Sequence, residues 1–418
     1  MSQTLSHIPA SERQERSRLE IDLGRLEANL CALRSAVSDE AGGAGGAGGA
    51  GRVRVCAVVK KNGYGLGAVP LAARLVKAGV DMLAVYSPDE AEQLIRQAIQ
   101  APLLIFMPVH RLSRTDLLYR HAVAGRLHLA VHDPGQLEAI NQIGRSFGIR
   151  MPVHLYLDTG MSRAGLNDRD WHATLERVRD ASHIHLAGLH THLATADGDP
   201  AFAHEQLAHF HRVVAASDFP ALSGQGERLC HAANTFATLR DPAFHLDMVR
   251  PGLGLHGYGP ESLKGTPRLD AMPTLMPIMR WVSRLVHVQR YPADSPVGYG
   301  ATHRLQRESM LGIVPIGYGD GYPLALSGRG VVRVRPVDGD AVSWCDAPVV
   351  GRVNMDQLVV DLTDVPCPVD SLIDAEVEII SDDPAAPNAL PKLAELAGSH
   401  CYEMLCRLAA SLPRKYRQ

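Results

Sequence analysis

Several short apolar runs of this chain end in residues that can do covalent or acid–base chemistry. These run ends are Lys60 and the segments 158–163, 190–192, 230–235 and 249–254. A lysine at the end of a strand suits a Schiff base. The hydroxyl of Thr235 and the backbone N–H groups of Gly252 and Leu253 suit a phosphate. Together these residue types indicate pyridoxal phosphate as a cofactor.

The histidines leave a metal site as an alternative. His190 and His192 lie two residues apart, so in an extended chain they face the same side, as zinc ligands can. Such a pair would fit a metal-dependent barrel hydrolase. No further set of His and Asp partners is evident, so we expect no metal and take His190 as structural.

The elements that must position these residues alternate between strand and helix. Apolar runs begin near residues 53, 82, 103, 128, 153 and 184, and helical patterns follow most of them. Strand–helix units of roughly 20 to 30 residues predict parallel β/α architecture. About eight units fit between Val53 and Gly259, which predicts a closed barrel with its working residues at the carboxyl ends of the strands.

The chain after residue 262 has a different pattern. Residues 279–282, 312–316, 331–334 and 349–362 resemble strands separated by Gly and Pro turns, with helical periodicity only at 388–397. We therefore expect a flexible tail over 1–16, a β/α barrel over 17–262 and a mainly-β domain over 263–418. The stretch 41–51, which holds seven of the 38 glycines, is expected to be a flexible loop insertion in the barrel.

Composition excludes several other classes of protein. The 418 residues are 46% hydrophobic, too apolar for a disordered chain, and the net charge of −3 is too balanced for a nucleic-acid binder. No apolar stretch approaches the roughly 20 residues of a membrane helix, and the first residues lack the apolar core of a secretion signal. Seven scattered cysteines without a CxxC pair indicate thiols in a reducing cytoplasm. We expect a cytoplasmic protein with no nucleic-acid or membrane partner.

Eight motifs in order make the chain similar to the alanine racemase family. AVVKKNGYG at 57–65 resembles the family's cofactor-lysine signature. The other motifs are DTGMSR (158–163), GLHTHLATAD (188–197), HAANT (231–235), DMVRPG (247–252), GYG (298–300), IGYGDGY (316–322) and GRVNMDQ (351–357). The resemblance spans most of the chain. It implies an N-terminal (β/α)8 barrel of the TIM type, a C-terminal mainly-β domain and a homodimer with shared active sites.

The resemblance also implies an isomerase that racemises L- and D-alanine with two bases. Lys60 would hold pyridoxal phosphate as a Schiff base and serve one face of the amino-acid substrate. Tyr299 of the partner subunit would serve the other face, with His192 lowering the pKa of its phenol. In this family the activity is linked to D-alanine and cell wall biosynthesis.

Further residues would hold the cofactor and the substrate. Arg250 would face the pyridine nitrogen, and Arg163 would bond the cofactor's phenolic oxygen near the substrate carboxylate. The Met355 backbone, with Asp356 nearby, would hold that carboxylate from the partner subunit. The remaining cofactor-binding set implied by the resemblance is Tyr64, His192, Asn234, Thr235, Gly252 and Leu253.

Three positions depart from the family pattern. Tyr156 stands where the family often has a lysine modified by carbon dioxide, so Arg163 must be oriented in another way. Ala410 aligns with a tyrosine that crowds the substrate side chain, and Asn354 replaces a small or thiol residue. A methyl group in place of a phenol leaves space, so we expect a pocket that also accepts serine or longer amino acids.

Two alternatives keep the cofactor but change the function. The same carbanion chemistry allows retro-aldol cleavage of β-hydroxy amino acids, which the loss of bulk at Ala410 would favour. A non-catalytic protein that binds pyridoxal phosphate would resemble the barrel alone. Tyr299 and a full second domain argue against that second alternative.

Overall fold

The computed structural model describes residues 16–38, 52–217, 228–259, 274–337 and 344–418. The chain folds into two compact units, one over Leu23–Ile278 and one that combines Met1–Asp22 with Met279–Gln418. The expected tail, apart from residue 16, and the expected insertion at 41–51 lie outside the described residues. The expected barrel began at residue 17 and ended at 262, so both of its boundaries differ from those of the compact unit.

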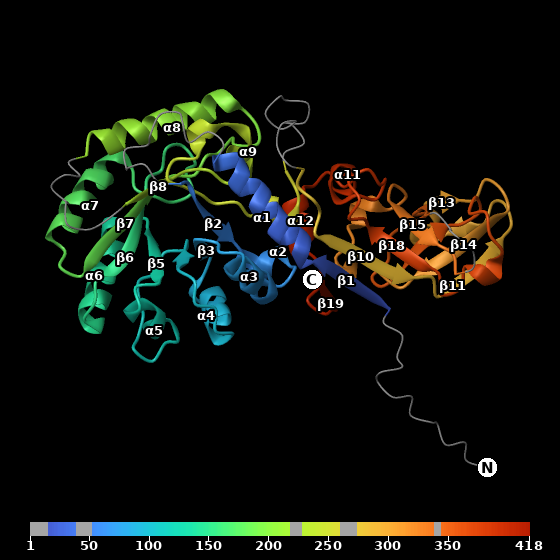
Figure 1. Ribbon diagram of the computed structural model, residues 1–418. Coiled ribbons are helices and arrows are strands. Elements are labelled where there is room, and N and C mark those ends of the chain that lie inside the picture. Colours follow the sequence, from blue (N-terminus) through green and yellow to red (C-terminus); the bar gives the residue numbers. More distant parts are fainter. Residues whose placement is uncertain (1–15, 39–51, 218–227, 260–273, 338–343) are drawn as a thin grey trace, which may run out of the picture. The chain divides into compact units, whose positions relative to one another are not determined.

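Eight parallel strands form the barrel of the unit over Leu23–Ile278 (Figure 1), in the order β8-β7-β6-β5-β4-β3-β2-β9. They are β2 (Arg54–Val58), β3 (Met82–Val85), β4 (Leu103–Ile105), β5 (Leu127–Val131), β6 (Met151–Tyr156), β7 (Ile184–His190), β8 (Leu229–His231) and β9 (Met248–Val249). A parallel bridge between Asn234 and Arg250 joins the two ends of this sheet just beyond β8 and β9. The predicted TIM-type barrel is confirmed.

Helices lie around the outside of these strands (Figure 1). They are α1 (Leu23–Ser38), α3 (Ala68–Lys77), α4 (Pro88–Arg96), α5 (Leu118–Val123), α6 (Pro134–Phe147), α7 (Asp168–Asp180), α8 (Pro200–Ala215) and α9 (Thr235–Arg240). Leu26, Leu30 and Leu33 of α1 are fully buried, at the three- and four-residue spacing that places them on one face of a helix. Polar caps fix several helix starts; the Asp133 carboxylate, for example, accepts the Gln136 N–H at 2.8 Å.

The other unit is built on a six-stranded sheet in the order β16-β15-β18-β10-β1-β19. Its strands are β1 (Ser17–Asp22), β10 (Met279–Arg284), β15 (Val331–Arg335), β16 (Cys345–Pro348), β18 (Glu376–Ile380) and β19 (Arg414–Arg417). A three-stranded sheet, β11 (His287–Tyr291), β14 (Ser309–Val314) and β17 (Leu358–Asp361), and the short pair β12 (Pro296–Val297) and β13 (His303–Arg304) complete the strands. Helices α11 (Leu390–Leu396) and α12 (Cys401–Cys406) lie between β18 and β19 along the chain. The expected mainly-β domain is confirmed, although the run 349–362 forms a loop and β17 rather than one strand.

Strand β1 belongs to this β unit because its neighbours come from the C-terminal part of the chain. It pairs antiparallel with β10 and parallel with β19. Leu19 and Ile21 are fully buried on one face, while Glu20 forms ion pairs with Arg18 at 2.6 Å and with Arg417. A six-residue alternating strand shows which face is buried but not which sheet buries it, so the sequence placed β1 in the barrel.

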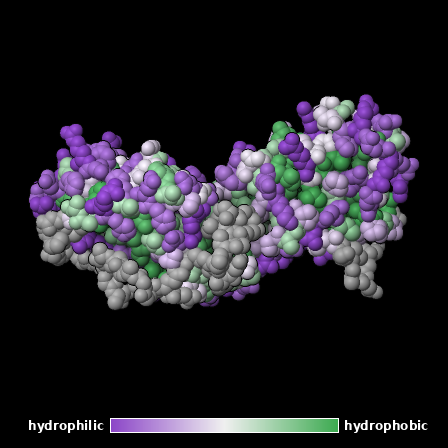
Figure 2. Space-filling model, turned by 90° about the horizontal axis from the view of Figure 1, so that it is seen from above, coloured by the Kyte–Doolittle hydropathy of each residue, from purple (hydrophilic) through white to green (hydrophobic). Residues whose placement is uncertain are grey.

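Hydrophilic residues cover much of the visible surface of each unit, with hydrophobic residues scattered among them (Figure 2). Within the described residues, none of the helices combines the length and the apolar character needed to cross a membrane. All seven cysteines lie in the described part of the chain, and none is joined in a disulfide.

Candidate active site

Lys60 lies one residue beyond the end of barrel strand β2 and begins the short helix α2 (Lys60–Tyr64), whose backbone is left-handed from Lys61 onward. Lys61 and Asn62 have φ values of 53°, and Tyr64 has 55°. Each non-glycine residue in this region costs roughly 1–2 kcal/mol, so other groups must hold the turn. The Glu90 carboxylate does so by accepting the Lys61 N–H at 2.8 Å while its second oxygen accepts the Tyr86 N–H at 2.7 Å.

The turn brings the Tyr64 side chain against the loop after β9, where only glycine fits. A Cβ atom at Gly252 would lie 2.1 Å from the Tyr64 hydroxyl oxygen. The Thr235 hydroxyl oxygen accepts the N–H groups of Gly252 and Gly254, each at 3.0 Å. Tyr64, Thr235 and Leu253 are all buried here. The Gly252 backbone, the Thr235 hydroxyl and the Tyr64 phenol thus lie close together, in an arrangement that suits a phosphate. We call this arrangement the cradle.

Arg250 is a buried cation beside this cradle, with only 4% of its surface exposed. Its guanidinium donates to the carbonyls of Thr191 at 2.9 Å and Ala232 at 3.0 Å, to His231 Nδ1 at 2.7 Å, and more weakly to His192 Nδ1 at 3.4 Å. Burial lowers the pKa of Arg250 to about 10, so it stays charged near neutral pH. Among the described residues no carboxylate pairs with it, and a buried cation without a counter-ion favours an anionic ligand.

His192 shows that several cations gather at this end of the barrel. Burial and the positive charges of Arg250, Arg163 and Lys60 lower the pKa of His192 to about 3. The structure therefore brings these four predicted residues together at the carboxyl ends of the strands. Pyridoxal phosphate, with its phosphate and phenolate, matches such a cationic site, and Lys60 supplies the amine that it requires.

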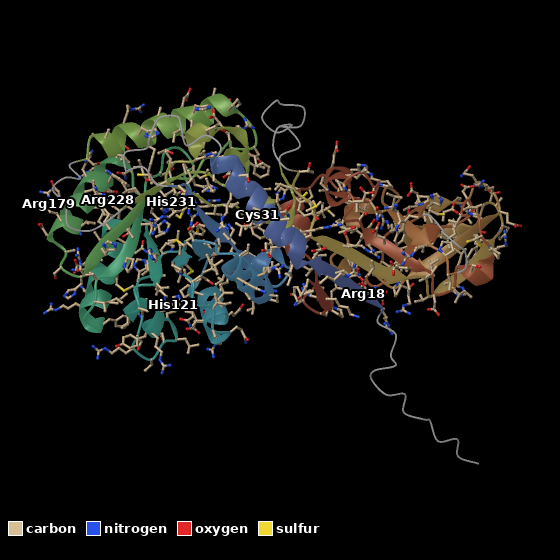
Figure 3. All side chains as sticks on the ribbon, in the orientation of Figure 1. Arg18, Cys31, His121, Arg179, Arg228 and His231 are labelled. Atoms are coloured by element: carbon tan, nitrogen blue, oxygen red, sulfur yellow. The ribbon has the colours of Figure 1, made fainter. Side chains whose placement is uncertain are left out.

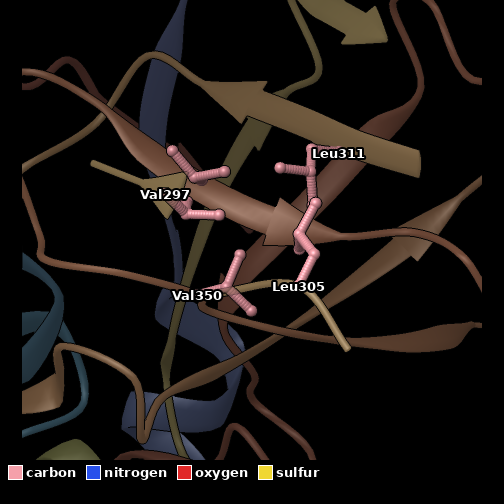
Figure 4. Close-up of a cluster of buried hydrophobic side chains, with 5 residues drawn as sticks. Val297, Leu305, Leu311 and Val350 are labelled. Atoms are coloured by element: carbon pink, nitrogen blue, oxygen red, sulfur yellow. The ribbon is translucent and has the colours of Figure 1, made fainter. Parts of the chain in front are cut away.

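Tyr299 lies in the β unit, at the tip of the β12–β13 hairpin. Its side chain is 72% exposed, and Met355, on the loop before β17, is 61% exposed. A buried cluster of Val297, Leu305, Leu311, Val350 and Val359 packs beneath the hairpin (Figure 4). The Tyr299 phenol and the loop that carries Met355 are thus exposed, while the residues beneath the hairpin are tightly packed. Asp356 is exposed on the same loop.

Comparisons with known proteins identify the family. The profiles described as "Alanine racemase, N-terminal domain" and "Alanine racemase, C-terminal domain" match residues 21–260 and 278–416. The chain is 33% identical to an alanine racemase of Symbiobacterium thermophilum, over 95% of this chain and 96% of that protein. It is 32% identical to an alanine racemase of Halothermothrix orenii, over 87% and 90% of the two chains. The chain belongs to the alanine racemase family.

Solved structures agree with this assignment. An alanine racemase from Streptomyces lavendulae matches with a TM-score of 0.81 and 30% identity, covering 97% of this chain and 98% of that one. An alanine racemase from Bartonella henselae with covalently bound pyridoxal phosphate shares the fold at a TM-score of 0.77 and 24% identity, covering 97% of this chain and all of that one. The order of barrel and β domain in this chain is thus that of alanine racemases.

Tyr156, where this alanine racemase family member departs from the family's lysine, lies against the cationic cluster. Its ring stacks on His190, with centroids 4.7 Å apart, and His190 stacks on His231 at 4.9 Å. Burial raises the pKa of Tyr156, opposed by the positive charge of Arg163. The phenol therefore lies close enough to Arg163 for the two groups to interact electrostatically, and the His190 ring is packed between those of Tyr156 and His231.

Several residues do not fit the roles given to them or were missed. The Asn234 side chain caps α9 by accepting the Ala237 N–H at 3.0 Å, so its side chain serves the helix. His231 contacts Arg250, His154 contacts His231, and Glu90 holds the Lys60 turn, but none of the three was among the predicted site residues. Only the position of His231 at a strand end could have indicated it, because the contacts of the other two join distant parts of the chain.

Proposed function

We propose that this protein is an isomerase that racemises L- and D-alanine with pyridoxal phosphate. The observation that carries the proposal is a buried Arg250, with no carboxylate partner among the described residues, beside Lys60, Arg163 and His192 in a family of alanine racemases. Lys60 Nζ would hold the cofactor, with Tyr64, Thr235, Gly252 and Leu253 around its phosphate. When bound, pyridoxal phosphate supplies an electron-withdrawing ring that stabilises negative charge on the substrate α-carbon.

Inverting that carbon needs a base on one face and an acid on the other. Lys60 Nζ serves one face, and the hydroxyl of Tyr299 from a second copy of the chain serves the other. Arg250 donates to His192 Nδ1, and His192 is neutral, so His192 carries its proton on Nε2. That N–H would donate to the Tyr299 oxygen and favour its ionised form, which lowers the pKa of the phenol.

We also propose a homodimer with shared sites. The high exposure of Tyr299 and Met355 supports it, because a catalytic phenol and a carboxylate-binding loop must meet their target outside the unit that carries them. Asp356 and the Met355 backbone would bind the substrate carboxylate together with Arg163. The composition and the seven thiols support a cytoplasmic location, where D-alanine would supply cell wall synthesis.

The function is tested with purified protein, pyridoxal phosphate and L-alanine. We expect D-alanine to accumulate to an equal mixture, and the bound cofactor to give a visible absorption band. Lys60→Ala should lose the band and the activity, whereas Tyr299→Phe should keep the band and lose the activity. Acetaldehyde or formaldehyde released from threonine or serine, without racemisation, would instead support the retro-aldol alternative. A visible band without any turnover would support the non-catalytic alternative.

A further inference from the structure

Three histidines form a continuous chain that leads from Arg250 into the barrel. Arg250 Nη1 lies 2.7 Å from His231 Nδ1, and His231 Nε2 lies 2.8 Å from His154 Nδ1. His154 Nε2 lies 3.0 Å from His128 Nδ1. These histidines come from β8, β6 and β5, and His231 and His154 are fully buried. Figure 3 labels His231, which belongs to strand β8, and His121, which belongs to helix α5.

Gly188 lets this chain cross the strand between β6 and β8. Strand β7 separates them, and Gly188 is the register partner of His154 on β7. A Cβ atom at residue 188 would lie 2.2 Å from His154 Nδ1, far inside van der Waals contact. The His154 ring therefore reaches His231 across the one residue type that leaves it room.

Only one arrangement of protons satisfies all three contacts. A guanidinium group can only donate, so His231 Nδ1 accepts, and a neutral His231 carries its proton on Nε2. That N–H donates to His154 Nδ1, and His154 Nε2 then donates to His128 Nδ1. Burial keeps the pKa of His231 and His154 well below the usual value and lowers that of His128 to about 4, so the three rings are neutral near pH 7.

We propose that His154 and His128 are positioning residues that lock His231 in the tautomer which holds Arg250. Without an acceptor at residue 154, the buried Nε2–H of His231 would lose its partner. The proton would then favour Nδ1, where it faces the guanidinium donor. Arg250 would lose one of its anchors and shift relative to His192 and the cofactor site. The kinetic part of this inference rests on the proposed function, whereas the tautomer itself does not.

Two matched variants test the inference. In His154→Asn the amide oxygen takes the place of Nδ1 and restores the acceptor, while His154→Leu has nearly the same shape without an acceptor. His121→Leu is the control, because His121 is also buried but bonds to the Ala101 carbonyl at 2.9 Å. The tautomer of His231 is determined from the ¹⁵N shifts of its ring nitrogens in the histidine-labelled full chain with pyridoxal phosphate, and racemisation of alanine is measured in parallel.

We expect the Nε2–H tautomer in the wild type, in His154→Asn and in the control, and loss of that single tautomer in His154→Leu. The leucine variant should lose about tenfold in kcat with KM unchanged, and asparagine should restore most of it. An Nδ1–H or doubly protonated His231 in the wild type overturns the inference, even if the leucine variant fails to fold. The inference is also overturned if His231 has the same tautomer in the leucine variant as in the asparagine variant. If neither the wild type nor any variant racemises alanine, the proposed function is wrong. The tautomer of His231 in the wild type and the variants still tests this inference.

Discussion

At the scale of single residues, Arg250 decides the charge and the proton positions of the site. It is buried, has no carboxylate partner in the part of the chain that the structure describes, and donates to two carbonyls and two imidazoles. In the proposed complex with pyridoxal phosphate, this guanidinium would face the pyridine nitrogen and keep it unprotonated, which would limit the spread of negative charge into the ring. The same guanidinium makes both His192 and His231 acceptors at Nδ1, so each presents its proton on the opposite side of the ring.

The exposed Ala410 gives a prediction about specificity. We expect the wild type to racemise serine or longer amino acids as well as alanine, because a methyl group leaves space where the family has a phenol. Ala410→Tyr should narrow this range, and Ser411→Tyr, at the exposed neighbouring position, serves as the control. Racemisation rates across a panel of L-amino acids measure both. A wild type that accepts alanine alone, or a tyrosine variant as broad as the wild type, would contradict the prediction.

At the scale of elements, the left-handed turn α2 delivers Lys60 and depends on Glu90. Glu90→Ala removes the acceptor of two backbone N–H groups, those of Lys61 and Tyr86. We expect a loss of roughly 1–3 kcal/mol in the free energy of unfolding and faster loss of the cofactor on dialysis. Urea unfolding and the visible absorption measure these effects.

A matched control comes from the same helix. Glu92 forms only an exposed ion pair with Arg96 at 3.2 Å, so Glu92→Ala should cost less than about 0.5 kcal/mol. Equal effects of the two substitutions would show that Glu90 does not hold the turn.

Much of the fold could be predicted from local patterns, and the rest depends on distant contacts. The apolar spacing of α1 and the runs before Lys60 and His190 identify their elements because helices and strands have fixed periods. The left-handed turn after Lys60 could not be predicted, since Lys61 and Asn62 ordinarily adopt other conformations. The place of β1 could not be predicted either, because strand pairing joins residues more than 250 positions apart.

The candidate site also has one part that local motifs could predict and another that depends on distant contacts. The motifs predicted that Lys60, Arg163, His192 and Arg250 act together, and in the structure the charges of Lys60, Arg163 and Arg250 all lower the pKa of His192. The histidine chain behind Arg250 could not be predicted. It needs the register of β6, β7 and β8, which places Gly188 beneath His154.

At the scale of the whole molecule, the buried neutral histidines make the barrel sensitive to acid. The pKa of His154, His190 and His231 lies well below its usual value in the folded chain because of burial. Below about pH 6.5 the unfolded chain therefore binds three more protons at these positions than the folded chain. Stability is present above that pH and should fall as the pH drops towards 5, and these three histidines alone contribute a slope that approaches about 4 kcal/mol per pH unit.

Urea unfolding at several pH values between 7 and 5 measures this slope. His154→Asn removes one of the three groups and should reduce the slope by about 1.4 kcal/mol per pH unit. A free energy of unfolding that does not change over this range would contradict the assignment of neutral, buried histidines.

The central claim is that each active site combines Lys60 of one copy with Tyr299 of another. Its most direct test mixes two inactive variants, Lys60→Ala and Tyr299→Phe, by co-expression with different tags, and measures L-alanine racemisation by the purified mixed dimer. Each variant alone should be inactive. The mixed dimer should recover about half of the wild-type rate, because one of its two sites then holds both native residues. A mixed dimer that forms but stays inactive would contradict the account.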